Sequence, residues 1–224
     1  MAKKLVTEKD IVEAARKGLK SFLVDEHTVL TPSARDAAVQ YRIELSRDVA
    51  GSTKHGGLEE VRLFSPHDPK SPTAKVVVAL GSDHGGFSMK EMLRSFIVDL
   101  GYTVADVGTN SEQACDYPDF AYAVASMVAQ GSAHKGIMID GVGVASAIVA
   151  NKIPGVRAVP CYSEFVAQSS REHNDANVLT LGGRVLGSEA AKSIVKLWLS
   201  TWFGGGRHQQ RVNKIADIEK RYMK

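Results

Sequence analysis

The stretch that decides the fold, residues 136–152, reads Gly-Ile-Met-Ile-Asp-Gly-Val-Gly-Val-Ala-Ser-Ala-Ile-Val-Ala-Asn-Lys. Its first part, together with Lys135, is a short apolar run typical of a strand buried on both faces. The run ends at Asp140, and a glycine turn then leads directly into a helix of small residues. A strand, a glycine turn and a helix N-terminus together form an anion site, because unpaired backbone N–H groups converge there and the helix dipole adds to them. Asp140 is expected at the C-terminal tip of the strand, where open α/β sheets place their chemistry.

The composition is that of an ordinary soluble globular protein. Its 224 residues suffice for one sizeable α/β domain and a smaller piece. The net charge of +3, from 28 basic and 25 acidic residues, is too balanced to predict a nucleic-acid partner. Cys115 and Cys161 have neither pairing nor metal-ligand spacing, which predicts free thiols in a reducing cytoplasm. No apolar run approaches the ~18 residues of a membrane span and the N-terminus lacks a signal peptide's apolar core, so a cytoplasmic protein without membrane contact is expected.

Residues 1–48 have a short β–α pattern of their own. Thr7 is placed to cap one helix, and Thr31-Pro32 marks the start of a second. Short strands are expected at 21–24 and 43–45. Residues 49–73 are rich in glycine and proline, and we interpret them as a linker in which only residues 58–64 could be extended.

From residue 74 onward, strands and helices alternate. The strands are expected at 76–80, 103–107, 135–140, 156–161 and 177–181. The helices are expected at 87–100, 144–151, 163–172, 188–202 and 207–222, and a further helix, through residue 130, is expected after a loop that contains Asp116-Tyr117-Pro118. Alternation with short loops predicts a mainly parallel sheet with helices on both faces. The predicted fold is a three-layer α/β domain of about five strands over residues 74–224, preceded by a small N-terminal α/β module.

Polar groups follow several of these strands. Asp83-His84 precedes two glycines that let the backbone approach a ligand closely, and Asp140 lies in its own glycine turn. Each aspartate alternatively caps the helix that follows it. His173 lies at a helix end, where a histidine more often matches the helix dipole than catalyses.

Arginines form the remaining signal. Arg207 and Arg211 share one helix face, and two guanidinium groups on one face suit a bidentately bound phosphate. A solvated basic face is the alternative interpretation. Arg184 follows two glycines at a strand end. Together, these signals on the loops of one sheet predict a small-molecule site. We interpret Cys161 as a core residue and assign no role to Cys115.

Six motifs in this domain carry a family resemblance. They are Gly81-Ser82-Asp83-His84-Gly85-Gly86-Phe87, Asp116-Tyr117-Pro118, Ala150-Asn151-Lys152, Ser170-Arg171-Glu172-His173-Asn174-Asp175, Gly183-Arg184 and Gly205-Gly206-Arg207-His208-Gln209-Gln210-Arg211. In order and spacing they resemble the type B ribose-5-phosphate isomerases and the related galactose-6-phosphate and allose-6-phosphate isomerases. The resemblance covers about residues 75–222. It implies a Rossmann-like sheet, no metal, no organic cofactor, and a homodimer whose active sites are built from both subunits, with a tetramer as the alternative.

The resemblance also implies roles for individual residues. His173 would assist opening of the furanose ring, and the turn from Gly141 to Gly143 would stabilise the enediolate through its N–H groups. The remaining implied contacts to the phosphorylated sugar come from Tyr117, from Asp83 and Asn174 to sugar oxygens, and from His84, Arg184, Arg207 and Arg211 to the phosphate.

One departure from the family pattern concerns the base. Many members have cysteine in place of Asp140, as the base that moves the proton between C1 and C2, and threonine or serine in place of Val142. Another branch uses a glutamate in place of Ser146. Asp140 is the only ionisable residue left in this loop, so we predict it to be the base.

The predicted function is therefore an aldose–ketose isomerase that interconverts ribose 5-phosphate and ribulose 5-phosphate through an enediol. One alternative is a sugar-phosphate-binding or assembly protein that has lost the base. Another is an isomerase of a different sugar phosphate, such as a hexose 6-phosphate.

The N-terminal segment carries a second resemblance. Val6-Thr7-Glu8, Gly18-Leu19 and residues 29–36 are similar to short modules of bacterial microcompartment enzymes, such as some ethanolamine-utilisation proteins. This implies recruitment to a microcompartment shell or enzyme partner through residues 1–48, and hence a location inside a microcompartment in the cytoplasm. A stabilising appendage is the alternative.

Overall fold

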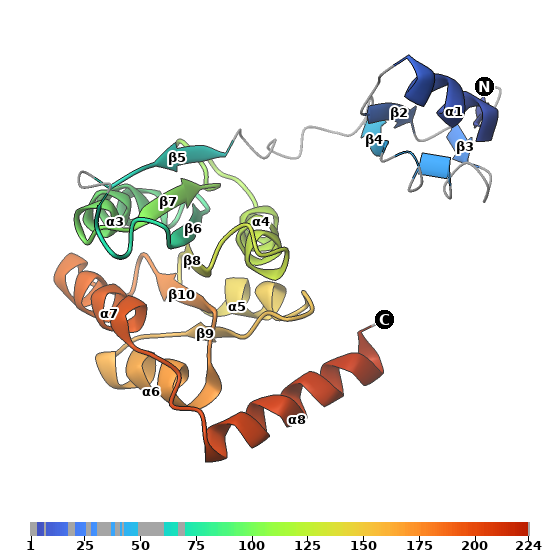
Figure 1. Ribbon diagram of the computed structural model, residues 1–224. Coiled ribbons are helices and arrows are strands. Elements are labelled where there is room, and N and C mark those ends of the chain that lie inside the picture. The colour runs from blue at the N-terminus through green and yellow to red at the C-terminus, as the bar shows by residue number, and fades with distance from the viewer. Residues whose placement is uncertain are drawn as a thin grey trace. The chain divides into compact units, whose positions relative to one another are not determined.

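The computed structural model describes residues 4–6, 8–17, 21–25, 28–30, 37–38, 41, 43–48, 61–66 and 70–223. The chain divides into two compact units, Met1–His55 and Gly56–Lys224 (Figure 1). None of the helices described in these ranges is long and apolar enough to cross a membrane.

The first unit combines the helix α1 (Glu8–Arg16) with two separate pairs of parallel strands. β1 (Lys4–Val6) pairs with β3 (Thr28–Leu30), and β2 (Ser21–Asp25) pairs with β4 (Glu44–Asp48). The predicted first helix and the strands at β2 and β4 are confirmed. The sequence did not predict β1 and β3, because three residues are too few for a period-two pattern to be visible.

A small apolar core holds this unit together. Ile11 and Ala14 of α1 are buried with Ala37, Ala38 and Ile43. Ala37 and Ala38 are the described helical residues of the predicted second helix, the rest of which lies outside the described residues apart from Tyr41.

The second unit is built on one six-stranded sheet, in the order β5-β7-β6-β8-β10-β9. The parallel strands are β6 (Val77–Ser82), β7 (Thr103–Asp106), β8 (Lys135–Asp140), β9 (Ala158–Pro160) and β10 (Val178–Gly182). The edge strand β5 (Arg62–Phe64) runs antiparallel to β7. The five predicted strands are confirmed, with ends shifted by at most two residues.

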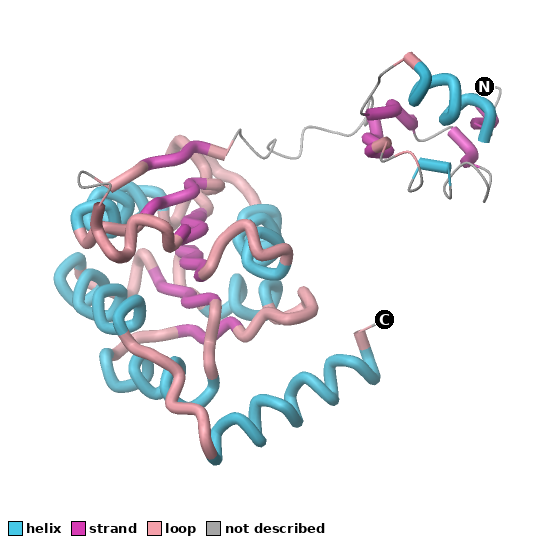
Figure 2. The backbone as a smooth tube through the Cα atoms, in the orientation of Figure 1, coloured by secondary structure: helices cyan, strands magenta, loops and turns pink. Residues whose placement is uncertain are grey.

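Helices cover both faces of this sheet, as Figures 1 and 2 show. The helices are α3 (Phe87–Asp99), α4 (Tyr117–Ala129), α5 (Val144–Ala150), α6 (Glu164–Asn174), α7 (Ser188–Ser200) and α8 (Arg207–Tyr222). Successive strand residues point to opposite faces, so Leu80 packs with α3 and α7 while Ala79 packs with α4. The predicted three-layer architecture is confirmed.

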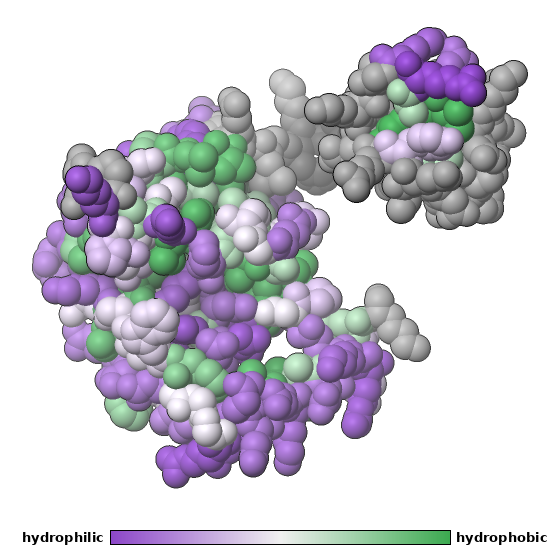
Figure 3. All heavy atoms as spheres, in the orientation of Figure 1, coloured by the Kyte–Doolittle hydropathy of each residue, from purple (hydrophilic) through white to green (hydrophobic). Residues whose placement is uncertain are grey.

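The helix α8 extends away from these layers (Figure 1). Of its residues, all of which are described, only Val212 is buried. Hydrophilic residues cover most of the α8 surface in view in Figure 3. The segment before α8 is attached to α6, because the Gly204 N–H donates to the Glu172 carbonyl at 2.9 Å.

The sixth strand corrects the predicted linker. Residues 61–66 contribute β5 to the sheet, and Thr73 Oγ1 donates to the Gly101 carbonyl at 3.0 Å. The predicted linker, residues 49–73, is therefore too long at its C-terminal end, and residues 49–60 lie outside the described residues. The side chains that hold β5, such as Asp106, are distant in sequence, so no local pattern reveals them.

Candidate active site

Three loops meet at the carboxyl end of the sheet, because β6, β8 and β10 are neighbours. The Asp83 N–H donates to the Ile139 carbonyl at 3.2 Å, and the Gly183 N–H donates to the Asp140 carbonyl at 2.7 Å. A Cβ atom at Gly183 would lie 2.6 Å from the carbonyl oxygen of Gly85, so only glycine permits this approach. These contacts fix the three loops against one another.

The Asp140 carboxylate is buried and accepts four hydrogen bonds. Oδ1 accepts from the N–H groups of Val142, at 2.7 Å, and of Gly143. Oδ2 accepts from the Ser146 N–H at 3.0 Å and from the Ser146 hydroxyl at 2.5 Å. A carboxylate has about four lone-pair sites, so every acceptor position of Asp140 is occupied. The side chain therefore caps the start of α5.

The glycine turn after β8 is held by its own backbone. Gly143 has φ +92°, a conformation that favours glycine, and a Cβ atom there would lie 2.8 Å from the backbone carbon of Leu181. The Gly143 carbonyl accepts from Thr180 Oγ1 at 2.5 Å, and Tyr162 Oη donates to the Val142 carbonyl at 3.1 Å. The N–H groups of Val142 and Gly143, predicted to face an enediolate, are bonded to Asp140 here.

Asp83 differs from Asp140 in its bonding. It is also buried, but only Oδ1 has a recorded partner, the Gly86 N–H at 3.1 Å, which lies just before α3. Among the described residues, the Gly85 N–H adds a weaker interaction with this carboxylate, no hydrogen bond of ordinary geometry is formed at Oδ2, and Oδ2 is not sealed from solvent. Burial raises the pKa of Asp83 and the Asp140 charge adds to this, while the Gly86 N–H and His84 oppose it.

His84 contacts the loop that leads into α4. Its Nδ1 lies 3.1 Å from the Cys115 carbonyl oxygen and 3.3 Å from the Cys115 nitrogen. Either tautomer therefore has a backbone partner at Nδ1, which leaves Nε2 for a ligand. Cys115, given no role from the sequence, anchors this imidazole through its backbone. Tyr117 begins α4 two residues later, at the edge of the same group.

We call Asp83, His84, Asp140, Gly141, Gly143 and Arg184 the loop group. The Arg184 side chain passes over the turn, with its Cδ 3.7 Å from where a Cβ atom of Gly141 would lie. The Arg184 N–H donates to the Gly141 carbonyl at 3.1 Å. The structure thus brings together six of the predicted site residues.

A second set, the helix-end group, comprises His173, Arg207, His208 and Arg211. The rings of His173 and His208 stack with centroids 4.3 Å apart and planes 10° apart, and Ser169 Oγ lies 3.1 Å from His173 Nδ1. Desolvation lowers the pKa of His208, and the charges of His173 and the two arginines lower it further. His208 was not among the predicted site residues, although it lies between the two arginines within one motif.

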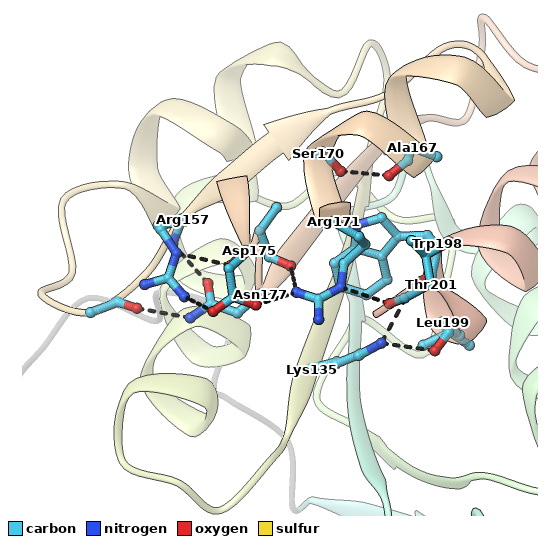
Figure 4. Close-up of polar contacts among 12 residues, drawn as sticks. Lys135, Arg157, Ala167, Ser170, Arg171, Asp175, Asn177, Trp198, Leu199 and Thr201 are labelled. Carbon is cyan, nitrogen blue, oxygen red and sulfur yellow. Dashed lines mark hydrogen bonds and ion pairs between the residues drawn. The ribbon is translucent and has the colours of Figure 1, made fainter. Parts of the chain in front are cut away.

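The end of α6 that carries His173 is braced by ion pairs (Figure 4). Asp175, with φ +47°, terminates the helix in the left-handed conformation. Its Oδ1 accepts from Arg171 at 2.9 Å and its Oδ2 accepts from Arg157 at 2.8 Å. The adjacent Asn174, predicted to hold a sugar oxygen, lies beside a groove of about 370 Å³ between β9 and α8.

No hydrogen bond or ion pair recorded for the described part of the chain joins the loop group to the helix-end group. The predicted site residues therefore form two sets within one chain. The first lies at the strand ends and carries the carboxylates; the second lies at the start of α8 and carries exposed guanidinium groups.

Known proteins share the sequence and the fold of this domain. Residues 78–215 match the family model described as Ribose/Galactose Isomerase. Ribose-5-phosphate isomerase B of Escherichia coli is 49% identical over 144 residues, which cover 64% of this chain and 97% of that protein. D-erythrulose-4-phosphate isomerase of Pectobacterium atrosepticum is 36% identical over 143 residues, covering 63% and 94%. A solved structure of Clostridium thermocellum ribose-5-phosphate isomerase B is 48% identical, with a TM-score of 0.65, and the match covers 66% of this chain and 99% of that one. The chain therefore belongs to the ribose/galactose isomerase family of sugar-phosphate isomerases.

Proposed function

We propose that this protein interconverts ribose 5-phosphate and ribulose 5-phosphate by proton transfer through an enediol. The observation that carries the proposal is the loop group, where two buried carboxylates, an imidazole and a guanidinium meet at the carboxyl end of the sheet. The 49% identity to a ribose-5-phosphate isomerase B supports this choice of sugar. The 36% identity to a D-erythrulose-4-phosphate isomerase makes a tetrose phosphate the first competing substrate.

We infer that the active protein is a homodimer with shared active sites. Among the described residues of one chain, no hydrogen bond or ion pair joins the loop group to the helix-end group, and α8 lies outside the three layers (Figure 1). The exposed side chains of the partner subunit's Arg207 and the partner subunit's Arg211 would complete the phosphate grip to which His84 and Arg184 of the loop group contribute. His173 would then reach the furanose ring from the same side.

The proposal is tested by turnover of ribose 5-phosphate in D₂O. An enediol mechanism exchanges the transferred hydrogen with solvent, so we expect ribulose 5-phosphate that contains deuterium at C1. Erythrulose 4-phosphate and hexose 6-phosphates, assayed at equal concentrations, rank the substrates by kcat/KM. A ranking that places ribose 5-phosphate below another sugar phosphate would replace the substrate and retain the reaction class.

The saturated Asp140 carboxylate favours a second candidate, a sugar-phosphate-binding protein without turnover. If Asp140 is the base, as the sequence predicts, it must first release one of its four donors. Calorimetric binding of ribose 5-phosphate without any turnover or hydrogen exchange would support this second candidate over the isomerase.

A further inference from the structure

We propose that Asp83, rather than Asp140, carries the proton between C1 and C2, and that Asp140 serves as the internal cap of α5. This assignment rests on the proposed isomerase function and names the base within that same site.

The bonding of Asp140 argues against a role in proton transfer. A general base must offer a free lone pair within hydrogen-bond reach of the proton that it takes. All four acceptor positions of Asp140 are occupied by Val142, Gly143 and Ser146, and Ser146 is itself fully buried. Protonation of Asp140 would leave a buried donor unpaired, at a cost of about 1–3 kcal/mol.

Asp83 meets the requirement for a free lone pair, which Asp140 does not. Its Oδ1 is held by the Gly86 N–H, which fixes the carboxylate, while no hydrogen bond of ordinary geometry is formed at Oδ2 among the described residues and Oδ2 is not sealed from solvent. The groups that face it are His84, Asp140 and the N–H groups of Gly85 and Gly86. Burial, the largest influence, raises its pKa toward the working range of a general base.

The carboxylate of Asp83 also lies beside the glycine turn that follows β8. A Cβ atom built on Gly85 would be 3.3 Å from Asp83 Oδ1 and 3.3 Å from Gly141 Cα, so the Asp83 carboxylate and the turn are close neighbours. The Arg184 side chain lies beside the same turn. A substrate bound over this turn would meet the Asp83 carboxylate without any movement of the α5 cap.

The step balances within the substrate. Asp83 takes the proton from C2 of the open-chain aldose, and the C–H electron pair forms the C1=C2 double bond of the enediol as the C1 carbonyl pair moves to O1, which takes a proton from water. O2 then gives its proton to water as the C2 carbonyl forms, and the C1=C2 electron pair takes the proton from Asp83 at C1. The net change is an internal transfer of hydrogen, so no oxidant or reductant is required.

Matched substitutions test the assignment. Asp83→Asn keeps an oxygen for the Gly86 N–H but removes the base, so we expect kcat to fall about 10²–10⁴-fold and deuterium incorporation to disappear, with ribose 5-phosphate binding retained. Asp140→Asn cannot accept all four donors, so we expect a lower melting temperature and a much smaller loss of kcat. Ser146→Ala, which removes one of those donors, should lower the melting temperature in the same way.

The pH profile of kcat/KM gives a second readout. The Asp140 charge raises the pKa of Asp83, so Asp140→Asn should move the acid limb of the profile to lower pH. A merely structural Asp140 with a base elsewhere would leave this limb in place. If Asp83→Asn does not fold, the acid limb of the Asp140→Asn profile decides. A shift of this limb to lower pH supports Asp83 as the base, and an unmoved limb overturns that assignment.

The outcomes separate this assignment from the function on which it rests. If Asp140→Asn abolishes hydrogen exchange while Asp83→Asn retains it, Asp140 is the base and the isomerase function stands. If the wild-type protein binds sugar phosphates but turns none over, the proposed function fails, and the assignment of Asp83 fails with it.

Discussion

Lys135 shows how one side chain in this fold makes stability depend on pH. It begins β8, at the opposite end of the strand from Asp140, and its Nζ donates to the Leu199 carbonyl at 2.8 Å (Figure 4). The ammonium lies 5.2 Å from the centroid of the Trp198 ring. Burial, with the Arg171 charge, lowers the pKa of Lys135 to about 7.

We predict that stability rises with pH through this residue. Below about pH 7, Lys135 is protonated in both states; between about 7 and 10.5, only the unfolded chain binds the proton, so raising the pH favours the folded state. The upper limit is ~1.4 kcal/mol per pH unit, reduced by solvent screening. Urea unfolding at about pH 6.5 and about pH 9 should show this increase for the wild type and not for Lys135→Met.

The control is Lys196→Met on the exposed surface of α7. It should retain the wild-type increase, because an exposed ammonium has nearly the same surroundings in both states. If the free energy of unfolding changes with pH equally for the wild type and Lys135→Met, the Lys135 ammonium keeps its ordinary pKa in the folded state.

At the scale of the element, β5 is attached to the sheet by a buried charge cluster. Asp106, at the end of β7, is fully buried, and its Oδ2 accepts from Lys90 at 2.6 Å and from Arg62 of β5 at 3.0 Å. The Arg94 guanidinium lies 4.3 Å from the centroid of the Phe64 ring. The two end residues of this three-residue strand are therefore held by side chains of β7 and α3.

We predict that Asp106→Asn destabilises the second unit by about 3–5 kcal/mol, because it leaves the fully buried Lys90 ammonium opposite a neutral amide. Urea unfolding measures the loss. Glu91→Gln, which removes the partly exposed partner of Lys90, should cost far less. Equal losses for the two variants would contradict a buried, strongly coupled pair.

The same elements show what the sequence could predict. The parallel strands were predictable because each is a short, mostly apolar run, and β6, β7, β8 and β10 are followed closely by glycine. The loop group was predictable because parallel strands end at one edge. An extended piece was expected within residues 58–64, which contain β5, but its pairing with β7 was not, since Arg62 meets Asp106 from 44 positions away. The fourfold bonding of Asp140 was visible only in part: a capping role was foreseen, but the contribution of the Ser146 hydroxyl needed the turn's geometry.

At the scale of the whole molecule, shared active sites predict complementation between inactive subunits. Asp83→Asn removes a loop-group residue and Arg211→Ala removes a helix-end residue, so each variant alone should be inactive. Random mixing makes half of the dimers mixed, and each mixed dimer has one site free of both changes, so about a quarter of wild-type activity should return. Assay of the mixture after subunit exchange measures this. No recovery would place both groups of a site on one subunit.

The division of the chain at residues 55 and 56 makes a final prediction about the N-terminal unit. A chain that begins at Gly56 keeps β5 and the Arg62–Asp106 pair, so we expect it to retain folding and turnover. A chain that begins at Ala74 loses both, exposes the edge of β7 and should melt at a lower temperature or aggregate. Thermal melts and ribose 5-phosphate turnover compare the two.

The chain that begins at Gly56 also tests whether the first unit binds a partner protein or stabilises the isomerase domain. The family match begins at residue 78, so neither β5 nor the first unit belongs to the part that this chain shares with the family model. We propose that residues 1–48 recruit the enzyme to a microcompartment shell or enzyme partner. The chain from Gly56 should then lose binding to a purified shell protein while keeping full kcat. If that chain instead unfolds or loses turnover, the first unit stabilises the isomerase domain and the recruitment proposal fails.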